Sequence, residues 1–170
     1  VLGALLPRDG FEAIWPRPPA WVSAAYLDQP LERYLALIAH GMPSATRVGV
    51  LLREDAVLQR HALRKAAQDR GLRLVIGSLG STENLSATLR PLLSEVDVLL
   101  IVPDSTVADV SMLQHMLITA YRQRVPVVAY SPALVKAGAA MGLYASPAQV
   151  GRQVVNMLKG PMNGPASGPD

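Results

Sequence analysis

The chain has 170 residues, of which 50% are hydrophobic and 17% are charged, a composition that excludes the intrinsically disordered class and suits one compact core of the usual size. The formal net charge of +3 comes mainly from arginines that are spread along the sequence, with few aromatic residues among them. This pattern argues against nucleic-acid binding, which needs clustered positive charge and stacking side chains.

The chain contains no cysteine, which excludes disulfides and thiolate metal sites. No apolar run approaches the roughly 20 residues that cross a bilayer, and no basic-then-apolar leader opens the sequence. Because the chain begins at Val1 within a strand-like stretch, we expect that an upstream portion has been removed, with room in it for a leader.

Two short strands separated by a proline-rich loop are predicted for the first part of the chain. The strands are VLGALLP and VSAAYLD, and the loop RDGFEAIWPRPPAW holds Pro16, Pro18 and Pro19, whose rings favour extended or turn backbone. Pro30 then suits the first turn of a helix over LERYLALIAHGMP, in which apolar residues recur on one face.

After this first helix, strand-like runs alternate with helical patterns. The strands are RVGVLL, LRLVIGSL, VDVLLIV, VPVVAYS and AAMGLYA, and the helices lie over 55–71, 81–95, 107–124, 132–138 and 146–160. Ser81 or Thr82 is expected to cap the second of these helices, and Pro91 to kink it or break it early. Ser146 is expected to cap the last helix, with Pro147 at its first position.

Alternation of this kind predicts an α/β fold with a doubly wound, parallel, five-stranded sheet. Five strands suit the flavodoxin-like order 2-1-3-4-5, which places a crevice at the carboxyl ends of the first and third strands. Those ends carry LLRED and IVPDST. Polar groups there can face a ligand while the strands behind them stay dry.

Two polar turns follow these strands: Arg53, Glu54 and Asp55 after the first, and Asp104, Ser105 and Thr106 after the third. The later turn is expected to begin a helix, where a hydroxyl caps the free amides or the amides hold an anion. The earlier turn is either a site whose arginine pairs with an acidic ligand group or an ordinary solvated turn.

No motif for catalysis or for metal or cofactor binding is present in the sequence. GSLGST lacks the GxxxxGK[ST] spacing of a phosphate loop, and Ser131 lacks the G-x-S-x-G context of a hydrolase nucleophile. His40, His61 and His115 lie in separate segments without metal-ligand spacing. We therefore expect no catalytic residue, no metal and no cofactor.

Several stretches together resemble one protein family: YLDQPLERYLALI, VGVLL, VPDSTV and VPVVAYSPALVKAGAAMGLYASPAQVGRQVVNML. They are similar to the ABC-transporter substrate-binding proteins of the type I periplasmic-binding fold, in the group whose described members bind amino acids such as tryptophan and tyrosine. The resemblance runs from about residue 1 to residue 158. Its most specific part is the block from SPALVKAGA to LYASPAQVGRQ.

In that fold, two α/β lobes close over a ligand at a hinge of crossing strands. The resemblance implies that residues 1–27 are the end of the first lobe and a hinge strand, that 28–145 are the second ligand-binding lobe, and that 146–160 return to the first lobe. Most of the first lobe is then absent from the chain. Residues 161–170, rich in Gly, Pro and Ser, are expected to be a disordered tail.

By position, the family's ligand contacts fall on the turns 53–55 and 104–106 and on Tyr130 and Ser131 after the fourth strand. Tyr130 either stacks on a flat ligand or caps the sheet edge with its hydroxyl in water. Amino-acid-binding relatives tend to carry a small polar turn at the first position and Ser-Asp at the last. RED and Tyr-Ser stand here, so the identity of the ligand does not carry over.

The sequence therefore predicts a binding protein and not an enzyme: the solute-binding component of an ABC-type uptake or sensing system, periplasmic or extracytoplasmic, that closes over a small molecule between two lobes. Its expected partners are an ABC permease or a membrane sensor, and a second copy of the chain through an exposed hinge face. Two alternatives stay open. One is a flavodoxin-like or nucleotide-binding enzyme that uses the same crevice for a cofactor, and the other is a cytoplasmic ligand-sensor domain.

Overall fold

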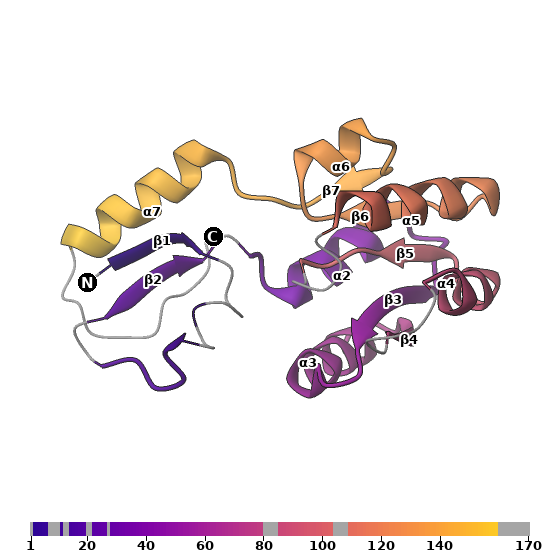
Figure 1. Cartoon of the computed structure of the whole chain (residues 1–170), viewed down its shortest axis with the longest axis horizontal. Helices are drawn as coiled ribbons and strands as arrows, with labels where there is room; N and C mark the ends of the chain where they lie inside the picture. Colours follow the sequence, from indigo (N-terminus) through magenta and orange to yellow (C-terminus); the bar gives the residue numbers. More distant parts are fainter. Residues whose placement is uncertain are drawn as a thin grey trace. The chain divides into compact units, whose positions relative to one another are not determined.

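The computed structural model describes residues 2–6, 11, 14–19, 22–26, 28–79, 85–103 and 109–159. These residues fall into two compact units: unit 1 takes the chain up to Pro30 together with the chain from Tyr144, and unit 2 is Leu31–Leu143. Both units combine strands with helices (Figure 1). That the units belong to two lobes of one binding protein stays a prediction.

Unit 2 is built on a five-stranded sheet in which every neighbouring pair is parallel. Its strands are β3 (Arg47–Arg53), β4 (Arg73–Leu79), β5 (Val98–Leu100), β6 (Val127–Ala129) and β7 (Met141–Gly142). Their order is β4-β3-β5-β6-β7, so the predicted order 2-1-3-4-5 is confirmed. In Figure 1 the arrowheads of β3 and β5 point the same way.

Helices cover both faces of this sheet. They are α2 (Leu31–Gly41), α3 (Val57–Gln68), α4 (Leu85–Ser94), α5 (Val110–Arg122) and α6 (Pro132–Lys136). Buried residues of α2 and α3 share one hydrophobic cluster with Val48, Val50 and Leu52 of β3, whereas those of α4, α5 and α6 share another with Leu51. Since successive strand residues point to opposite faces, β3 is buried on both sides, which explains its unbroken apolar run.

Two strands are shorter than their apolar runs predict. β5 takes three residues of VDVLLIV, and β6 takes three residues of VPVVAYS. Beyond the end of β5, the Ile101 N–H still donates to the Val128 carbonyl at 2.9 Å, and both Ile101 and Val102 are buried. The apolar run therefore indicates which residues are buried in the core. This buried stretch extends past the residues that pair as a strand.

Helix α4 runs through Pro91 and ends only at Ser94, so the predicted early break is wrong. A proline inside a helix costs about 3 kcal/mol. Leu89, Leu92 and Leu93 on either side of it are all buried, and each fully buried leucine contributes roughly 1.5–3 kcal/mol. Burial of the three leucines outweighs the cost of the proline, and the helix continues.

Helix α5 begins later than predicted. Its cap is Asp109, whose carboxylate accepts a hydrogen bond from the Ser111 N–H at 3.1 Å and another from Ser111 Oγ at 2.7 Å. The helix predicted over 107–124 therefore starts at Val110, and the turn 104–106 lies outside the described residues. Aspartate is among the best capping residues, and the buried face of α5 starts at Leu113, one turn after this cap.

The last helix, α7 (Pro147–Lys159), begins as predicted. Ser146 and Gln149 cap it reciprocally: the Gln149 N–H donates to Ser146 Oγ at 3.3 Å, and the Ser146 N–H donates to Gln149 Oε1 at 2.8 Å. This is the capping-box arrangement, and Pro147 stands at the first position, where no backbone donor is needed.

Unit 1 pairs β1 (Leu2–Leu6) with β2 (Ser23–Tyr26) in parallel, and α7 packs against both strands. Phe11, Val22, Ala24 and Tyr26 form a small buried cluster, in which the rings of Phe11 and Tyr26 meet edge to face at 5.8 Å. Such pairs add to the free energy gained from burial alone. The two short strands predicted from the sequence are present here.

Three predictions fall on residues outside the described part of the chain: the cap Ser81 or Thr82 of α4, the site turn 104–106, and the tail 161–170. Within the described part, no helix is both long enough and apolar enough to cross a bilayer.

Candidate functional site

The carboxyl ends of the parallel strands meet at one edge of the sheet in unit 2. Arg53 ends β3 and is followed by Glu54 and Asp55, and Tyr130 and Ser131 follow β6. The structure therefore brings these five predicted residues to the same edge. One strand, β5, lies between β3 and β6; with neighbouring strands about 4.8 Å apart, the two turns are separated by roughly 10 Å.

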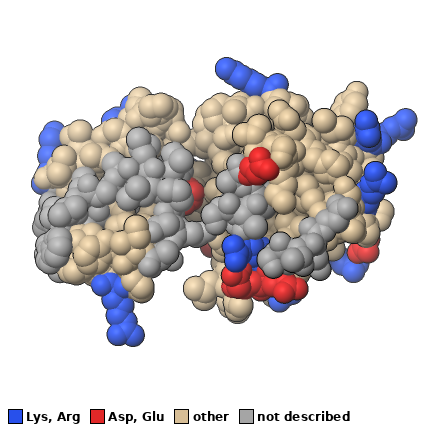
Figure 2. All heavy atoms as spheres, viewed as in Figure 1, with Lys and Arg blue, Asp and Glu red and all other residues tan. Residues whose placement is uncertain are grey.

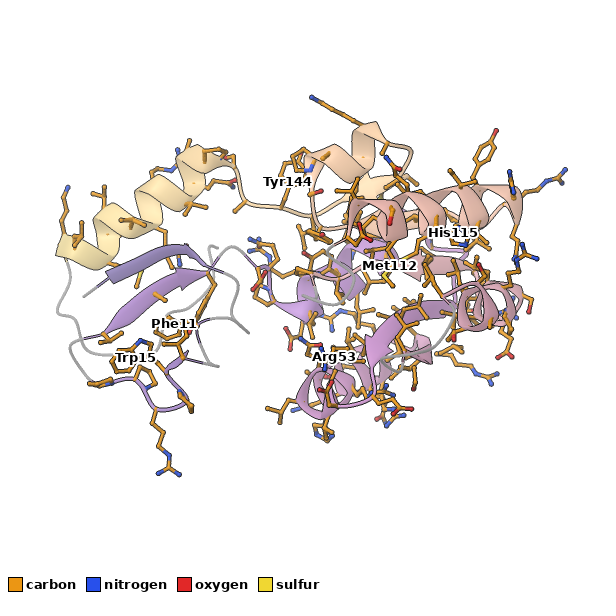
Figure 3. All side chains as sticks on the ribbon, viewed as in Figure 1. Phe11, Trp15, Arg53, Met112, His115 and Tyr144 are labelled. Carbon is orange, nitrogen blue, oxygen red and sulfur yellow. The ribbon has the colours of Figure 1, made fainter. Side chains whose placement is uncertain are left out.

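Arg53 and Asp55 form an ion pair across the first turn. Arg53 Nε donates to Asp55 Oδ1 at 2.8 Å and Arg53 Nη2 donates to Oδ2 at 2.9 Å, the two-pronged geometry typical of arginine with a carboxylate. Figure 3 shows Arg53 where β3 ends, beside α3, and in Figure 2 basic and acidic atoms touch at that place. Arg53 thus already has a carboxylate partner from its own chain.

The Arg53–Asp55 pair lies in solvent. The hydrogen bond from Arg53 lowers the pKa of the Asp55 carboxyl below its ordinary value, as an adjacent cation must. The two side chains are 46% and 68% exposed, so water screens the pair and it adds little to the free energy of unfolding. Glu54 is exposed as well. Contact of any of these three residues with a solute stays a prediction.

Arg60 was not among the site residues predicted from the sequence. It reaches the same edge from the first turn of α3. Its Nη2 donates to the Arg53 carbonyl at 2.8 Å and to Ser78 Oγ at 2.9 Å, and its Nε donates to the Arg53 carbonyl at 3.2 Å. Arg60 therefore joins the carboxyl ends of β3 and β4. One signal in the sequence points to it: a basic residue in the first turn of a helix opposes the helix dipole and needs another reason to be there.

Tyr130 and Ser131 are both engaged with the fold. Ser131 caps α6, its Oγ accepting a hydrogen bond from the Leu134 N–H at 3.3 Å. The half-buried ring of Tyr130 packs against the hydrophobic clusters on both faces of the sheet. This packing suits the interpretation in which Tyr130 closes the edge of the sheet, while stacking on a flat ligand stays a prediction.

A hollow of about 740 Å³ lies at the opposite edge of the sheet, among the connections that lead into β3, β5 and β6. Its lining includes Asp97 but none of the predicted site residues. The carboxylate of Asp97 already accepts hydrogen bonds from the backbone N–H groups of Thr46 and Arg47, from Thr46 Oγ1 and from the Arg47 guanidinium. With its oxygens occupied in this way, Asp97 holds the fold together and offers little to a ligand.

Two of the three histidines make contacts on helix surfaces. His115, labelled on α5 in Figure 3, has its Nε2 atom 2.8 Å from Ser86 Oγ and so links α5 to α4. His40 Nδ1 lies 2.8 Å from the Ala36 carbonyl one turn earlier in α2. Among the described residues, no group of three or more His, Asp or Glu side chains lies close enough together to hold a metal ion.

The sequence of residues 18–168 matches the family described as ABC transporter substrate binding protein. The chain belongs to this family. The resemblance predicted from the sequence is thereby confirmed, and with it the type of fold. No curated protein matches this family member in sequence.

Solved structures similar to this family member include the ABC domain in complex with L-Trp from Streptococcus pneumoniae, a conserved domain protein from Vibrio cholerae, and a ligand-free, open substrate binding protein from Clostridium difficile. Their sequence identities to it are 20%, 24% and 23%, with TM-scores of 0.65, 0.64 and 0.65. The matches cover 86%, 88% and 88% of this chain but 55%, 54% and 53% of theirs. The chain thus spans about half the length of these structures, and at such identities the likeness shows the fold alone.

Proposed function

We propose that the chain is the solute-binding part of an ABC-type uptake or sensing system, and that the carboxyl edge of the five-stranded sheet forms one wall of its solute site. The observation that carries the proposal is the family match over residues 18–168. It is supported by the polar and aromatic side chains of Arg53, Arg60 and Tyr130 at that edge, because open parallel sheets take their ligands at the carboxyl ends of their strands.

The mechanism that we propose is closure of two lobes over the solute. A solute shifts an open–closed equilibrium only as far as it binds one form better than the other, so contacts made only in the closed form supply the free energy of closure. Hinge motion of this kind needs no chemical step. The chain is accordingly proposed to bind its solute and release it unchanged.

The location and partners follow from the same proposal. A protein that delivers a solute to an ABC permease, or reports it to a membrane sensor, works in the periplasm or elsewhere outside the cytoplasm, and we propose that location for this chain. Pairing of two copies through an exposed hinge face stays a prediction. The relative from Streptococcus pneumoniae holds L-Trp, which makes amino acids the first solutes to test.

The test is a thermal-shift screen of the full-length protein, with both lobes, against amino acids, sugars and other small metabolites, followed by calorimetry on any that stabilise it. A solute at 100 times its Kd adds about 2.7 kcal/mol to the free energy of unfolding, which raises the Tm by several degrees. Flavins and nicotinamide dinucleotides are the controls, because the enzyme alternative predicts that they bind. Stabilisation by these cofactors alone, or by nothing in the screen, would contradict the proposal.

A further inference from the structure

We propose that Arg60 is the anion-recognising residue of the carboxyl edge, and that the solute carries a carboxylate or a similar small anionic group that Arg60 binds. This inference rests on the proposed function and adds to it a chemical class of solute and the residue that selects it. Three observations support it: the hydrogen-bond partners of the arginines at the two edges of the sheet, the position of Arg60 in α3, and the partial burial of the Arg60 side chain.

The other arginines at the ends of β3 already hold carboxylates. Arg53 binds Asp55 through two bonds, at 2.8 and 2.9 Å. At the opposite edge, Arg47 binds Asp97 through Nη2 at 2.6 Å and Nε at 3.2 Å. Each of these cations is neutralised by an aspartate of its own chain, so neither needs a solute to balance its charge.

Arg60 differs because its partners among the described residues are all neutral oxygens. Nη2 bonds the carbonyls of Leu52 and Arg53 and the hydroxyl of Ser78, and Nε bonds the Arg53 carbonyl. Among the described residues, no carboxylate oxygen lies within ion-pair distance of Arg60, and none accepts a hydrogen bond from its Nη1. Nε and Nη2 anchor the side chain, and the N–H groups of Nη1 have no partner among the described residues.

Two electrostatic costs act on this cation. Arg60 is half-buried, and removing a charged group from water is unfavourable unless an opposite charge balances it. It also stands in the first turn of α3, where the positive end of the helix dipole repels a cation. An anionic solute group would offset both costs, and a guanidinium is the side chain whose planar donors best match a carboxylate.

A purely structural role for Arg60 is the competing interpretation. In that case the residue only ties the end of β3 to Ser78 of β4, and a solute anion would not affect it. The two interpretations differ in what they predict for free anions: an arginine with a purely structural role does not bind acetate, whereas an anion-recognising arginine does.

The first experiment therefore titrates sodium acetate into the ¹⁵N-labelled wild-type protein at constant ionic strength and follows the arginine Nε–H signals by NMR. The signal of Arg60, assigned by its loss in Arg60→Lys, is expected to shift along a saturating curve. Arg64, exposed one turn further along α3, is the matched control and is expected to shift little. An Arg60 shift no larger than that of Arg64 overturns the proposal, and this test needs no known solute.

The second experiment uses an amino acid that stabilises the wild-type protein, together with the amide of that amino acid. Arg60→Gln is expected to weaken binding of the acid roughly 10- to 100-fold, the usual loss for a hydrogen bond to a charged group, and to leave binding of the amide nearly unchanged. Arg60→Lys is expected to restore part of the affinity for the acid, and Arg64→Gln to leave it unchanged. Thermal unfolding of each variant shows that it is folded.

The failures of the two proposals are distinguishable. If acid and amide lose affinity equally in Arg60→Gln, or neither loses any, the role of Arg60 is overturned while solute binding stands. If Arg60 responds to acetate but no solute stabilises the protein, the proposed function fails and the anion site remains.

Discussion

Asp97 shows how one residue can set the start of two strands. It stands one position before β5, and its carboxylate accepts hydrogen bonds from the backbone N–H groups of Thr46 and of Arg47, the first residue of β3, at 2.9 and 2.8 Å. The bond from Arg47, then that from the Thr46 amide, hold the pKa of Asp97 well below its ordinary value. These contacts tie together segments about 50 residues apart in the sequence.

Replacing Asp97 by asparagine is expected to lower the free energy of unfolding at pH 7 by roughly 1–2 kcal/mol, because hydrogen bonds to a charged group are lost. Since the pKa of Asp97 is lower in the folded than in the unfolded state, its stabilisation is present above the unfolded value near 4 and is lost as the pH falls through the folded value. Urea unfolding at pH 7, 5 and 3.5 measures both effects. Asp97→Asn should lose less stability than the wild type on acidification.

The control is Asp69→Asn, at an exposed residue just after α3, which should change the free energy of unfolding by no more than about 0.5 kcal/mol. Equal slopes of stability against pH for the wild type and Asp97→Asn would contradict the role of Asp97.

At the scale of elements, the approach of α4 to the sheet depends on the absence of a side chain in β4. Gly77 pairs with Leu51 of β3 in the parallel register. A Cβ atom at Gly77 would lie 2.5 Å from Leu51 Cδ2 and 3.2 Å from Thr88 Cγ2 of α4. Leu51 occupies the space that a side chain at position 77 would fill, so the packing of strand, strand and helix requires glycine there.

Gly77→Ala is expected to lower the free energy of unfolding by roughly 1–3 kcal/mol, the usual cost of overpacking a core. Gly151→Ala in α7 is the opposite case: its Cβ would meet nothing within 4 Å, and alanine favours the helix by roughly 0.5–1 kcal/mol. Denaturant unfolding of the two variants beside the wild type measures both. A Gly77→Ala protein as stable as the wild type would show that Leu51 moves aside at little cost.

At the scale of the whole molecule, the two units differ in how much they bury. Unit 2 has hydrophobic clusters on both faces of a five-stranded sheet, whereas unit 1 is built on a two-stranded sheet, whose described buried residues include Phe11, Tyr26 and Val150. Local opening requires less free energy where fewer apolar contacts are broken. Unit 1 is therefore expected to be the less stable part of the chain.

Hydrogen exchange of the purified protein tests this expectation. Backbone amides of β1 and β2 should exchange about tenfold or more faster, relative to their intrinsic rates, than those of β3 and β5. The amides of β3 are the internal control, because this strand is buried on both faces. Equal protection in the strands of both units would mean that they unfold together.

Much of the fold was predictable because it depends on local patterns. The capping box of Ser146 and Gln149 joins residues three positions apart, and the alternation of apolar runs with helical stretches led to the correct strand order. The predictions failed where packing between distant segments determines where a helix begins or ends. Burial of three leucines carries α4 through Pro91, and α5 starts at Val110 after its cap Asp109, later than the predicted residue 107.

The candidate site divides in the same way. The place of Arg53, Asp55, Tyr130 and Ser131 at one edge could be predicted from the apolar runs that they follow, because the carboxyl ends of parallel strands meet at the same edge of a sheet. Which arginine there has no carboxylate partner among the described residues depends on the tertiary structure. Arg60 meets Ser78 across 18 positions, and that contact depends on the register of β3 with β4 and on the packing of α3, which arise from the burial of many side chains together and have no local signature in the sequence.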